Sequence, residues 1–143
     1  MKKIFLIGLL STFAYTQQGI VTIGDNPVII KSNEVIVEVL GMVCSFCAYG
    51  LEEGLSDVTG VDKKKYKNGL SIDIDSQYVK IAALEDKIID LDKIASIIRD
   101  AGFEANTIFK LKEKEVVTYK LDKSNKMIAM NHDHDHTDHN HNH

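Results

Sequence analysis

Two segments of the chain alternate between hydrophobic and polar residues, which is the pattern of half-buried β-strands. In Glu34–Leu40 the three valines fall on alternate positions, and Leu70–Asp75 repeats the alternation. After Ser76–Gln77 the run Tyr78–Leu84 is again apolar. We therefore predict one strand at residues 34–40 and a two-stranded hairpin within residues 70–84.

Two further segments repeat their apolar residues at helical spacing. The first begins at Cys47, and its apolar face contains Ala48, Leu51, Leu55 and Val58. The second is LDKIASIIRDAG, with Asp90 as its candidate N-cap and Gly102 placed to end it in a left-handed conformation. Candidate strands follow at Asn106–Leu111 and Val116–Leu121.

The order from Val35 to Ile108 is then strand, helix, strand, strand, helix, strand. This order predicts an α+β, ferredoxin-like βαββαβ fold, with a four-stranded antiparallel sheet and both helices on one face. The chain has 143 residues, 44% of them hydrophobic, which is enough for one domain with its own core. Its net charge of −4 gives no sign of a nucleic-acid-binding surface and suits a cationic ligand.

The first residues, MKKIFLIGLLSTFAYTQQ, have the pattern of an export signal. Two lysines precede an apolar run at residues 4–15, which is shorter than the ~20 residues of a membrane span. Small side chains at Thr12 and Ala14 offer a cleavage site. We predict a cleaved signal peptide at residues 1–16 rather than a retained anchor, and an exported, periplasmic protein.

Both cysteines of the chain, Cys44 and Cys47, lie in one C-x-x-C motif between the first strand and the first helix. Such a pair forms a disulfide, a redox centre or a metal clip. A thioredoxin-like centre places a cis-proline downstream, whereas the single proline, Pro27, lies upstream. A disulfide here closes only a small loop and adds little stability. A helix start stabilises thiolate, which binds soft ions such as Cu(I), Hg(II) or Zn(II), so the metal clip is favoured over the other two.

The stretch V-x-G-M-V-C-S-F-C-x₃-L-E-x₂-L, with DAGFEA after the second helix, closely resembles the heavy-metal-associated domain. That family comprises copper chaperones, metal-binding modules of copper-transporting ATPases and periplasmic mercury-binding proteins. The resemblance spans about residues 35–108. It implies that Cys44 and Cys47 are the metal ligands. It also implies that Met42 supports the loop from a buried position and that Phe103 lies near the metal.

Two features depart from the family pattern. Val43 stands where the family usually has threonine, and the distance from Cys47 to Gly102 is longer, with DKKKYKNG enlarging a hairpin or loop. Neither departure touches a ligand. Glu52 and Leu55 match helix positions that are structural in the family.

These observations divide the chain into five parts. Residues 1–16 are the signal peptide, and residues 17–33 are an N-terminal extension, either a hairpin or an ordered arm with a turn at Gly24–Pro27. Residues 34–109 are the part that the resemblance assigns to a heavy-metal-associated domain. Residues 110–125 are a C-terminal extension with a candidate strand, and residues 126–143 are a histidine-rich tail that we expect to be disordered without metal.

All six histidines of the chain lie in its last twelve residues. They are His132, His134, His136, His139, His141 and His143. They alternate with aspartate and asparagine, which favours a native tail over a purification tag. Imidazole and carboxylate together suit Zn(II), Cu(II) or Ni(II), so the tail is a candidate second metal site that releases its ion as histidine protonates below about pH 6.

We therefore expect a metal-binding protein, not an enzyme, that carries or buffers a soft metal ion. Cu(I) is favoured, with Hg(II) and Zn(II) as alternatives. The ion would pass by ligand exchange to a membrane metal transporter or to another metal-binding domain, and we expect no nucleic-acid partner. Two other function classes are a thiol–disulfide oxidoreductase and an accessory subunit that docks on a transporter through its sheet edge.

Overall fold

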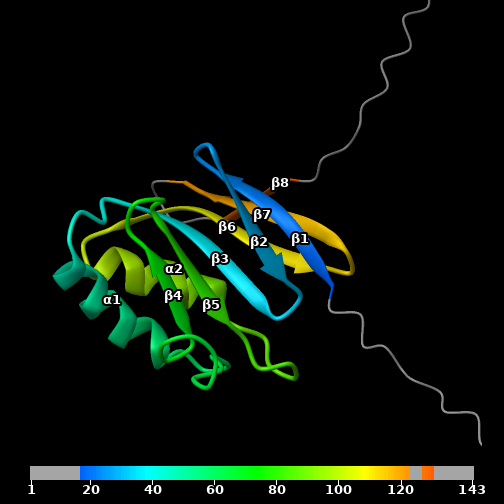
Figure 1. Ribbon diagram of the computed structural model, residues 1–143, viewed down its shortest axis with the longest axis horizontal. Coiled ribbons are helices and arrows are strands. Elements are labelled where there is room, and N and C mark those ends of the chain that lie inside the picture. Colours follow the sequence, from blue (N-terminus) through cyan, green and yellow to red (C-terminus); the bar gives the residue numbers. More distant parts are fainter. Residues whose placement is uncertain (1–16, 123–126, 131–143) are drawn as a thin grey trace, which may run out of the picture.

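The computed structural model describes residues 17–122 and 127–130 of the chain (Figure 1). Its strands are β1 (Gln18–Ile23), β2 (Asn26–Lys31), β3 (Glu34–Leu40), β4 (Leu70–Asp73), β5 (Tyr78–Ala82), β6 (Glu104–Lys112), β7 (Glu115–Leu121) and β8 (Met127–Met130). Its helices are α1 (Ser45–Ser56) and α2 (Leu91–Asp100). The predicted mixture of two helices with antiparallel strands is confirmed.

Six strands form one antiparallel sheet in the order β4-β5-β3-β6-β7-β8. The first four of these are the strands of the predicted βαββαβ unit, and α1 and α2 connect them in that order, while β7 is the candidate strand predicted at Val116–Leu121. The predicted four-stranded sheet is wrong in size, because β7 and β8 extend it beyond β6. A turn at Glu113 and Lys114, both with positive φ, brings β7 back beside β6.

The extension has a physical reason in the side chains of β7. Tyr119 and Leu121 pack against the core on the helix side of the sheet, and Val116 packs against the cluster on the other side. A strand with apolar side chains on both faces buries them when it pairs with an open edge of the sheet. The four-stranded unit therefore continues into a wider sheet.

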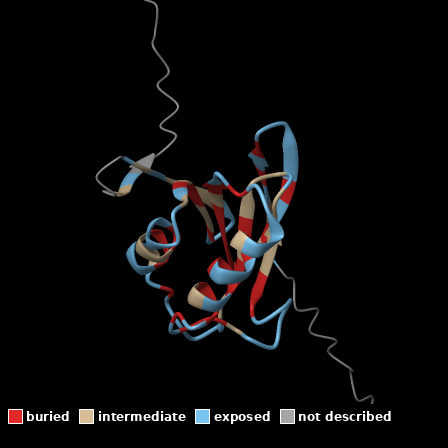
Figure 2. Ribbon diagram, turned by 90° about the vertical axis from the view of Figure 1, so that its left-hand side faces the viewer, coloured by how far each residue is buried: buried red, intermediate tan, exposed pale blue. Residues whose placement is uncertain are grey.

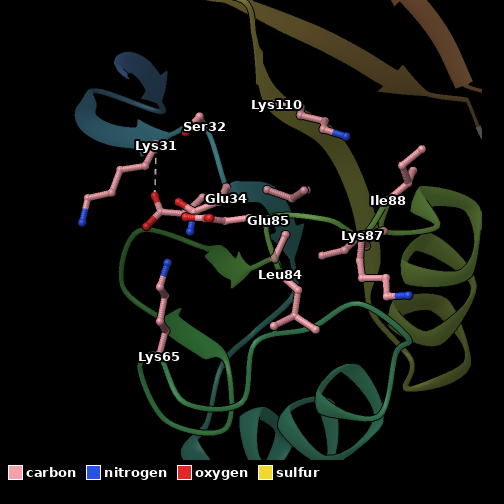
Figure 3. A pocket seen from close by; sticks show the side chains of 13 residues that line it. Lys31, Ser32, Glu34, Lys65, Leu84, Glu85, Lys87, Ile88 and Lys110 are labelled. Carbon is pink, nitrogen blue, oxygen red and sulfur yellow. Dashed lines mark hydrogen bonds between the residues drawn. The ribbon is translucent and has the colours of Figure 1, made fainter. Parts of the chain in front are cut away.

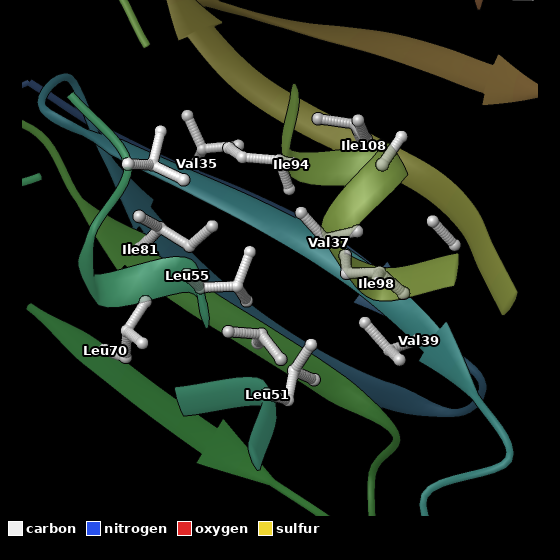
Figure 4. Close-up of a cluster of buried hydrophobic side chains, with 14 of the residues drawn as sticks. Val35, Val37, Val39, Leu51, Leu55, Leu70, Ile81, Ile94, Ile98 and Ile108 are labelled. Atoms are coloured by element: carbon white, nitrogen blue, oxygen red, sulfur yellow. The ribbon is translucent and has the colours of Figure 1, made fainter. Parts of the chain in front are cut away.

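The main core lies between the sheet and the two helices, where the buried residues gather in Figure 2. The three valines of β3 point into it, and Figure 4 shows Leu51 and Leu55 of α1 and Ile94 and Ile98 of α2 packed around them. All of these side chains are buried. The alternation in β3 thus places both helices on one face of the sheet, as predicted.

The β1–β2 hairpin covers the opposite face of the sheet. Its inward residues pack against Ile36 of β3, and they are Val21, Ile23, Val28 and Ile30. Gly19 allows this close approach, because a Cβ there would lie 2.9 Å from Val116 Cγ2 and 3.0 Å from Leu111 Cδ1. The N-terminal extension is therefore a hairpin, one of the two forms expected, and its turn is at Gly24–Asp25.

The ends of several elements differ from the sequence prediction. The strand expected at Leu70–Asp75 ends at Asp73, because residues 74–77 form a turn. The Asp90 carboxylate accepts a hydrogen bond from the Lys93 amide at 3.0 Å, and Gly102 has a φ of +89°, so both predicted ends of α2 are confirmed. Of the two helices in the described part, neither has the length and apolar content needed to cross a membrane.

Candidate metal centre

Cys44 and Cys47 lie where β3 passes into α1. Cys44 is the N-cap of α1, with extended backbone angles (φ −151°, ψ 153°), so the helix begins earlier than the predicted start at Cys47. The Cys44 sulfur accepts a hydrogen bond from the Cys47 amide at 3.4 Å, and the Cys44 carbonyl accepts one from Ala48 at 3.3 Å. Helix geometry therefore places both sulfurs on one side of the first turn.

The two thiols are in direct contact and are not cross-linked. Their sulfur atoms lie 2.6 Å apart, and the Cys44 side chain is exposed while that of Cys47 is half-buried. Metal–sulfur bonds of about 2.3 Å hold two sulfurs on one ion roughly 4 Å apart or more. Rotation of the two side chains away from each other would thus open a binding position between them.

The contact makes the two thiols unequal. The hydrogen bond from the Cys47 thiol, followed by the Cys47 amide, lowers the pKa of Cys44 below its ordinary value. Donating that hydrogen bond, together with burial, raises the pKa of Cys47. The first thiolate therefore forms on Cys44, where the helix N-terminus also favours negative charge.

Two predicted supporting residues pack against the loop that carries the motif. Met42 is 1% exposed and belongs to the main core, so its thioether faces away from solvent. Phe103 is half-buried at the end of α2, and its Cδ1 would lie 3.9 Å from a Cβ built on Gly41. The structure thus brings Met42 and Phe103 to the loop that leads into Cys44.

The predicted structural residues of α1 are buried. Leu55 is in the main core, and the Glu52 carboxylate lies beneath the polar loop at residues 62–69. It pairs with the Lys67 amino group at 2.9 Å and accepts a hydrogen bond from Asn68 at 3.1 Å. These two contacts hold the long loop between α1 and β4 against the helix.

Apolar and acidic groups surround the sulfurs at the surface. Val43 and Phe46 are 84% and 91% exposed, although both lie directly beside the cysteines. A hollow next to Cys44 is also lined by Asp73 at the end of β4 and Asp75 of the β4–β5 turn. The sulfurs are thus open to a macromolecular partner as well as to an ion.

The sequence reasoning missed Gln77, which lies in the β4–β5 turn. Its amide oxygen accepts hydrogen bonds from the backbone N–H groups of Gly41 at 2.9 Å and Met42 at 3.1 Å. Its amide nitrogen donates to the carbonyls of Met42 and Ile74, each at 2.5 Å. The predicted topology places this turn and the cysteines at the same end of the sheet, so a polar residue of the turn could have been predicted to contact the cysteine-bearing loop.

The predicted second metal site lies outside the described residues, which stop before all six histidines of the tail. Within residues 17–122 and 127–130, no group of three or more histidine, cysteine, aspartate or glutamate side chains is arranged to hold a metal ion. The donor set of the candidate centre in this part of the chain is the cysteine pair.

A separate hollow opens at the other end of β3 (Figure 3). Four lysines line it, and they are Lys31, Lys65, Lys87 and Lys110. Glu34 lies among them and is 2% exposed. Its carboxylate accepts hydrogen bonds from the Lys31 amide at 3.0 Å and from the Tyr66 hydroxyl. This network fastens the loop at residues 62–69 to the start of β3.

Comparison with known proteins finds similar solved structures. The metallochaperone CopZ is 21% identical, with a TM-score of 0.43, over 50% of this chain and 97% of CopZ. A copper-binding domain from HMA7, a P-type ATPase, is 30% identical, with a TM-score of 0.41, over 51% of this chain and 89% of that domain. The yeast copper transporter domain Ccc2A, solved in apo and Cu(I)-loaded states, is 28% identical, with a TM-score of 0.42, over 56% and 96% of the two chains.

No family model matches the chain, and neither does any curated protein. The matches to these three solved structures cover between 50% and 56% of this chain.

Proposed function

We propose that this protein binds a soft metal ion through Cys44 and Cys47 and passes it to a partner, with Cu(I) as the favoured ion. The observation that carries the proposal is the pair of uncross-linked sulfurs, 2.6 Å apart and facing solvent at the start of α1. Thiolate is a soft ligand, and a helix N-terminus favours its formation. Two sulfurs fit a two-coordinate ion, whereas zinc would take further ligands from elsewhere.

Ligand exchange follows from the unequal thiols. The Cys44 thiolate takes the incoming ion first, because hydrogen bonds from Cys47 lower its pKa. The ion then displaces the remaining proton from the Cys47 sulfur to solvent, and the two sulfurs share the metal. A thiolate of the partner adds to form a three-coordinate complex, and the two cysteines leave in turn. The transfer makes and breaks only metal–sulfur and sulfur–hydrogen bonds.

The partner we propose is a membrane metal transporter or another metal-binding domain. The exposed Val43 and Phe46 support direct docking, because apolar side chains at a partner site become buried in the complex. We further propose that the protein is exported with residues 1–16 as its signal, on the strength of the pattern of positive, apolar and small residues there. The histidine tail would collect divalent ions as a separate store.

Titration of the reduced protein with Cu(I), Hg(II) and Zn(II) tests the proposal. The variants are Cys44→Ser/Cys47→Ser and, separately, a deletion of residues 131–143. We expect the double serine variant to lose tight Cu(I) and Hg(II) binding and the deletion to retain it. Equal Cu(I) affinity in the double serine variant and the wild type would contradict the dithiolate site.

The same samples test the redox alternative. Thiol counting before and after exposure to oxidant, together with an insulin-reduction assay, measures disulfide formation and turnover. We expect no acceleration of insulin reduction. A catalytic rate that disappears in the double serine variant would instead support a thiol–disulfide oxidoreductase.

A further inference from the structure

Gln77 joins two segments that are far apart in the sequence. Its side chain reaches from the β4–β5 turn to the loop between β3 and α1, and the two lie at the same end of the sheet in Figure 1. The amide uses its full capacity, because its oxygen accepts two backbone hydrogen bonds and its nitrogen donates two. Two backbone N–H groups lie on one side of the amide and two carbonyls on the other. These partners fix its orientation, with the oxygen toward the N–H groups and the nitrogen toward the carbonyls.

These contacts replace strand pairing at the place where the sheet ends. The ladder between β3 and β5 stops at Glu38 and Tyr78, so Gly41 and Met42 lie beyond it. The carbonyl of Gln77 accepts the Val39 amide at 2.8 Å, and its side chain then takes up both the N–H and the carbonyl of Met42. One residue therefore continues the ladder from β3 to within two positions of Cys44.

The backbone of Gln77 is unusual for a residue with a side chain. Its φ of +56° lies in the left-handed region, where a non-glycine residue is strained and glycine is not. Glycine would relieve that strain but could not make any of the four side-chain hydrogen bonds. The strained conformation thus accompanies a side chain that makes four hydrogen bonds, three of them to the loop between β3 and α1.

We propose that Gln77 is a positioning residue for the dithiolate site, an inference that rests on the proposed function. By holding Gly41 and Met42 it fixes the approach of the chain to Cys44, so the two sulfurs converge before an ion arrives. Metal binding then does not have to order these residues. Without the clamp, ordering the backbone of one residue weakens binding by about tenfold.

Two variants separate this role from a contribution to folding alone. Gln77→Gly removes the side chain and relieves the strain at φ +56°, whereas Gln77→Met keeps the length of the side chain without its amide. Glu113→Gly is the matched control for backbone strain, because Glu113 has a φ of +59° in the distant β6–β7 turn. Asn106→Ala is the control for a lost side-chain hydrogen bond, since Asn106 of β6 donates to Glu38 of β3 at 2.6 Å and this bond joins two strands.

The measurements are Cu(I) affinity against a competing chromogenic chelator, the rate of Cu(I) release, and hydrogen exchange at Gly41 and Met42. We expect Gln77→Gly and Gln77→Met to bind Cu(I) about tenfold more weakly, to release it faster and to exchange these amides faster. Both controls should match the wild type. A dissociation constant and release rate within about twofold of wild type in both Gln77 variants would overturn the inference.

The failure of this inference is distinguishable from failure of the proposed function. Normal binding in the Gln77 variants, beside lost binding in Cys44→Ser/Cys47→Ser, overturns the role of Gln77 and leaves the dithiolate site in place. Normal binding in the double serine variant overturns the site itself, and the positioning role with it.

Discussion

The hydrogen bond between Tyr66 and Glu34 gives a sharp test of how the long loop at residues 62–69 is held. Glu34 is 2% exposed, and its carboxylate accepts one hydrogen bond from the Tyr66 hydroxyl and another from the Lys31 amide. Tyr66→Phe removes the hydroxyl and leaves a buried carboxylate with one partner fewer. A hydrogen bond to a charged group contributes about 1.5–3 kcal/mol, so we expect the free energy of unfolding to fall by about that amount at pH 7.

Tyr49→Phe is the matched control, because it also removes a tyrosine hydroxyl that donates to a glutamate. Tyr49 donates to Glu53 at 3.3 Å on the exposed side of α1, and its ring remains 6.0 Å from the Lys67 amino group when the hydroxyl is lost. We expect a change within about 0.5 kcal/mol there. The assay is urea unfolding followed by circular dichroism, with the slope m checked for constancy. Equal losses in the two variants would refute the argument from burial.

The same hydroxyl predicts a pH dependence of stability. Burial, then the hydrogen bond to Glu34 and the charges of Glu34 and Tyr78, raise the pKa of Tyr66 above its ordinary value of 10.0. The folded protein therefore holds this proton more tightly than the unfolded chain. The contribution is fully present below about pH 10 and is lost as the pH rises toward the folded-state pKa. The stability difference between wild type and Tyr66→Phe should shrink above pH 10, and a constant difference would contradict the assignment.

Three further predictions concern the strained glycines in turns, the order in which the two thiols react, and the effect of the cysteines on stability. Gly69→Ala should destabilise the protein by about 2 kcal/mol or more in urea unfolding, because φ is +88° and the added Cβ would lie 2.3 Å from Val61 Cγ1. Gly24→Ala is the control, because Gly24 has a φ of +57° but open space around it, and it should cost about 1 kcal/mol. Iodoacetamide at neutral pH should label Cys44 before Cys47 in peptide mass spectra, since the pKa of Cys44 is lowered and that of Cys47 raised, and equal rates would contradict this asymmetry. Cys44→Ser/Cys47→Ser should leave the free energy of unfolding of the metal-free protein in urea within about 0.5 kcal/mol of wild type, because serine is also a good N-cap. A larger loss would give the cysteines a structural role.

The sequence predicts those parts of the fold that local periodicity controls. The alternation of β3 specifies one face for the helices, and the Asp90 cap and Gly102 specify the ends of α2. The size of the sheet is different, because β7 joins through its pairing with β6, and pairing between strands leaves no local signature. The sequence also leaves the N-terminal extension open between a hairpin and an extended arm, because only contact with Ile36 on the far face of the sheet selects the hairpin.

The candidate site, like the fold, is predictable from the sequence only in part. The spacing of Cys44 and Cys47 predicts two sulfurs at a helix start, because i and i+3 positions share a helix face. The unequal thiols and the role of Gln77 depend on distances between atoms. Gln77 lies 35 residues from Met42 in the sequence, and only the pairing of β5 with β3 brings the two together. A glutamine between two strand patterns reads as an ordinary turn residue.

The contacts at the two ends of β3 differ in kind. At its start, the buried Glu34 is tied to Lys31 and Tyr66, and any lost partner there leaves a charged group unsatisfied in the interior. Beyond its other end, both cysteines are accessible to solvent, and the loop is held by a side chain from a turn. The sulfurs can therefore separate to take an ion without disturbing the core, because rotating an accessible side chain costs little. A buried start of β3 and a loop held at its other end would thus let the proposed site bind and release an ion while the fold stays intact.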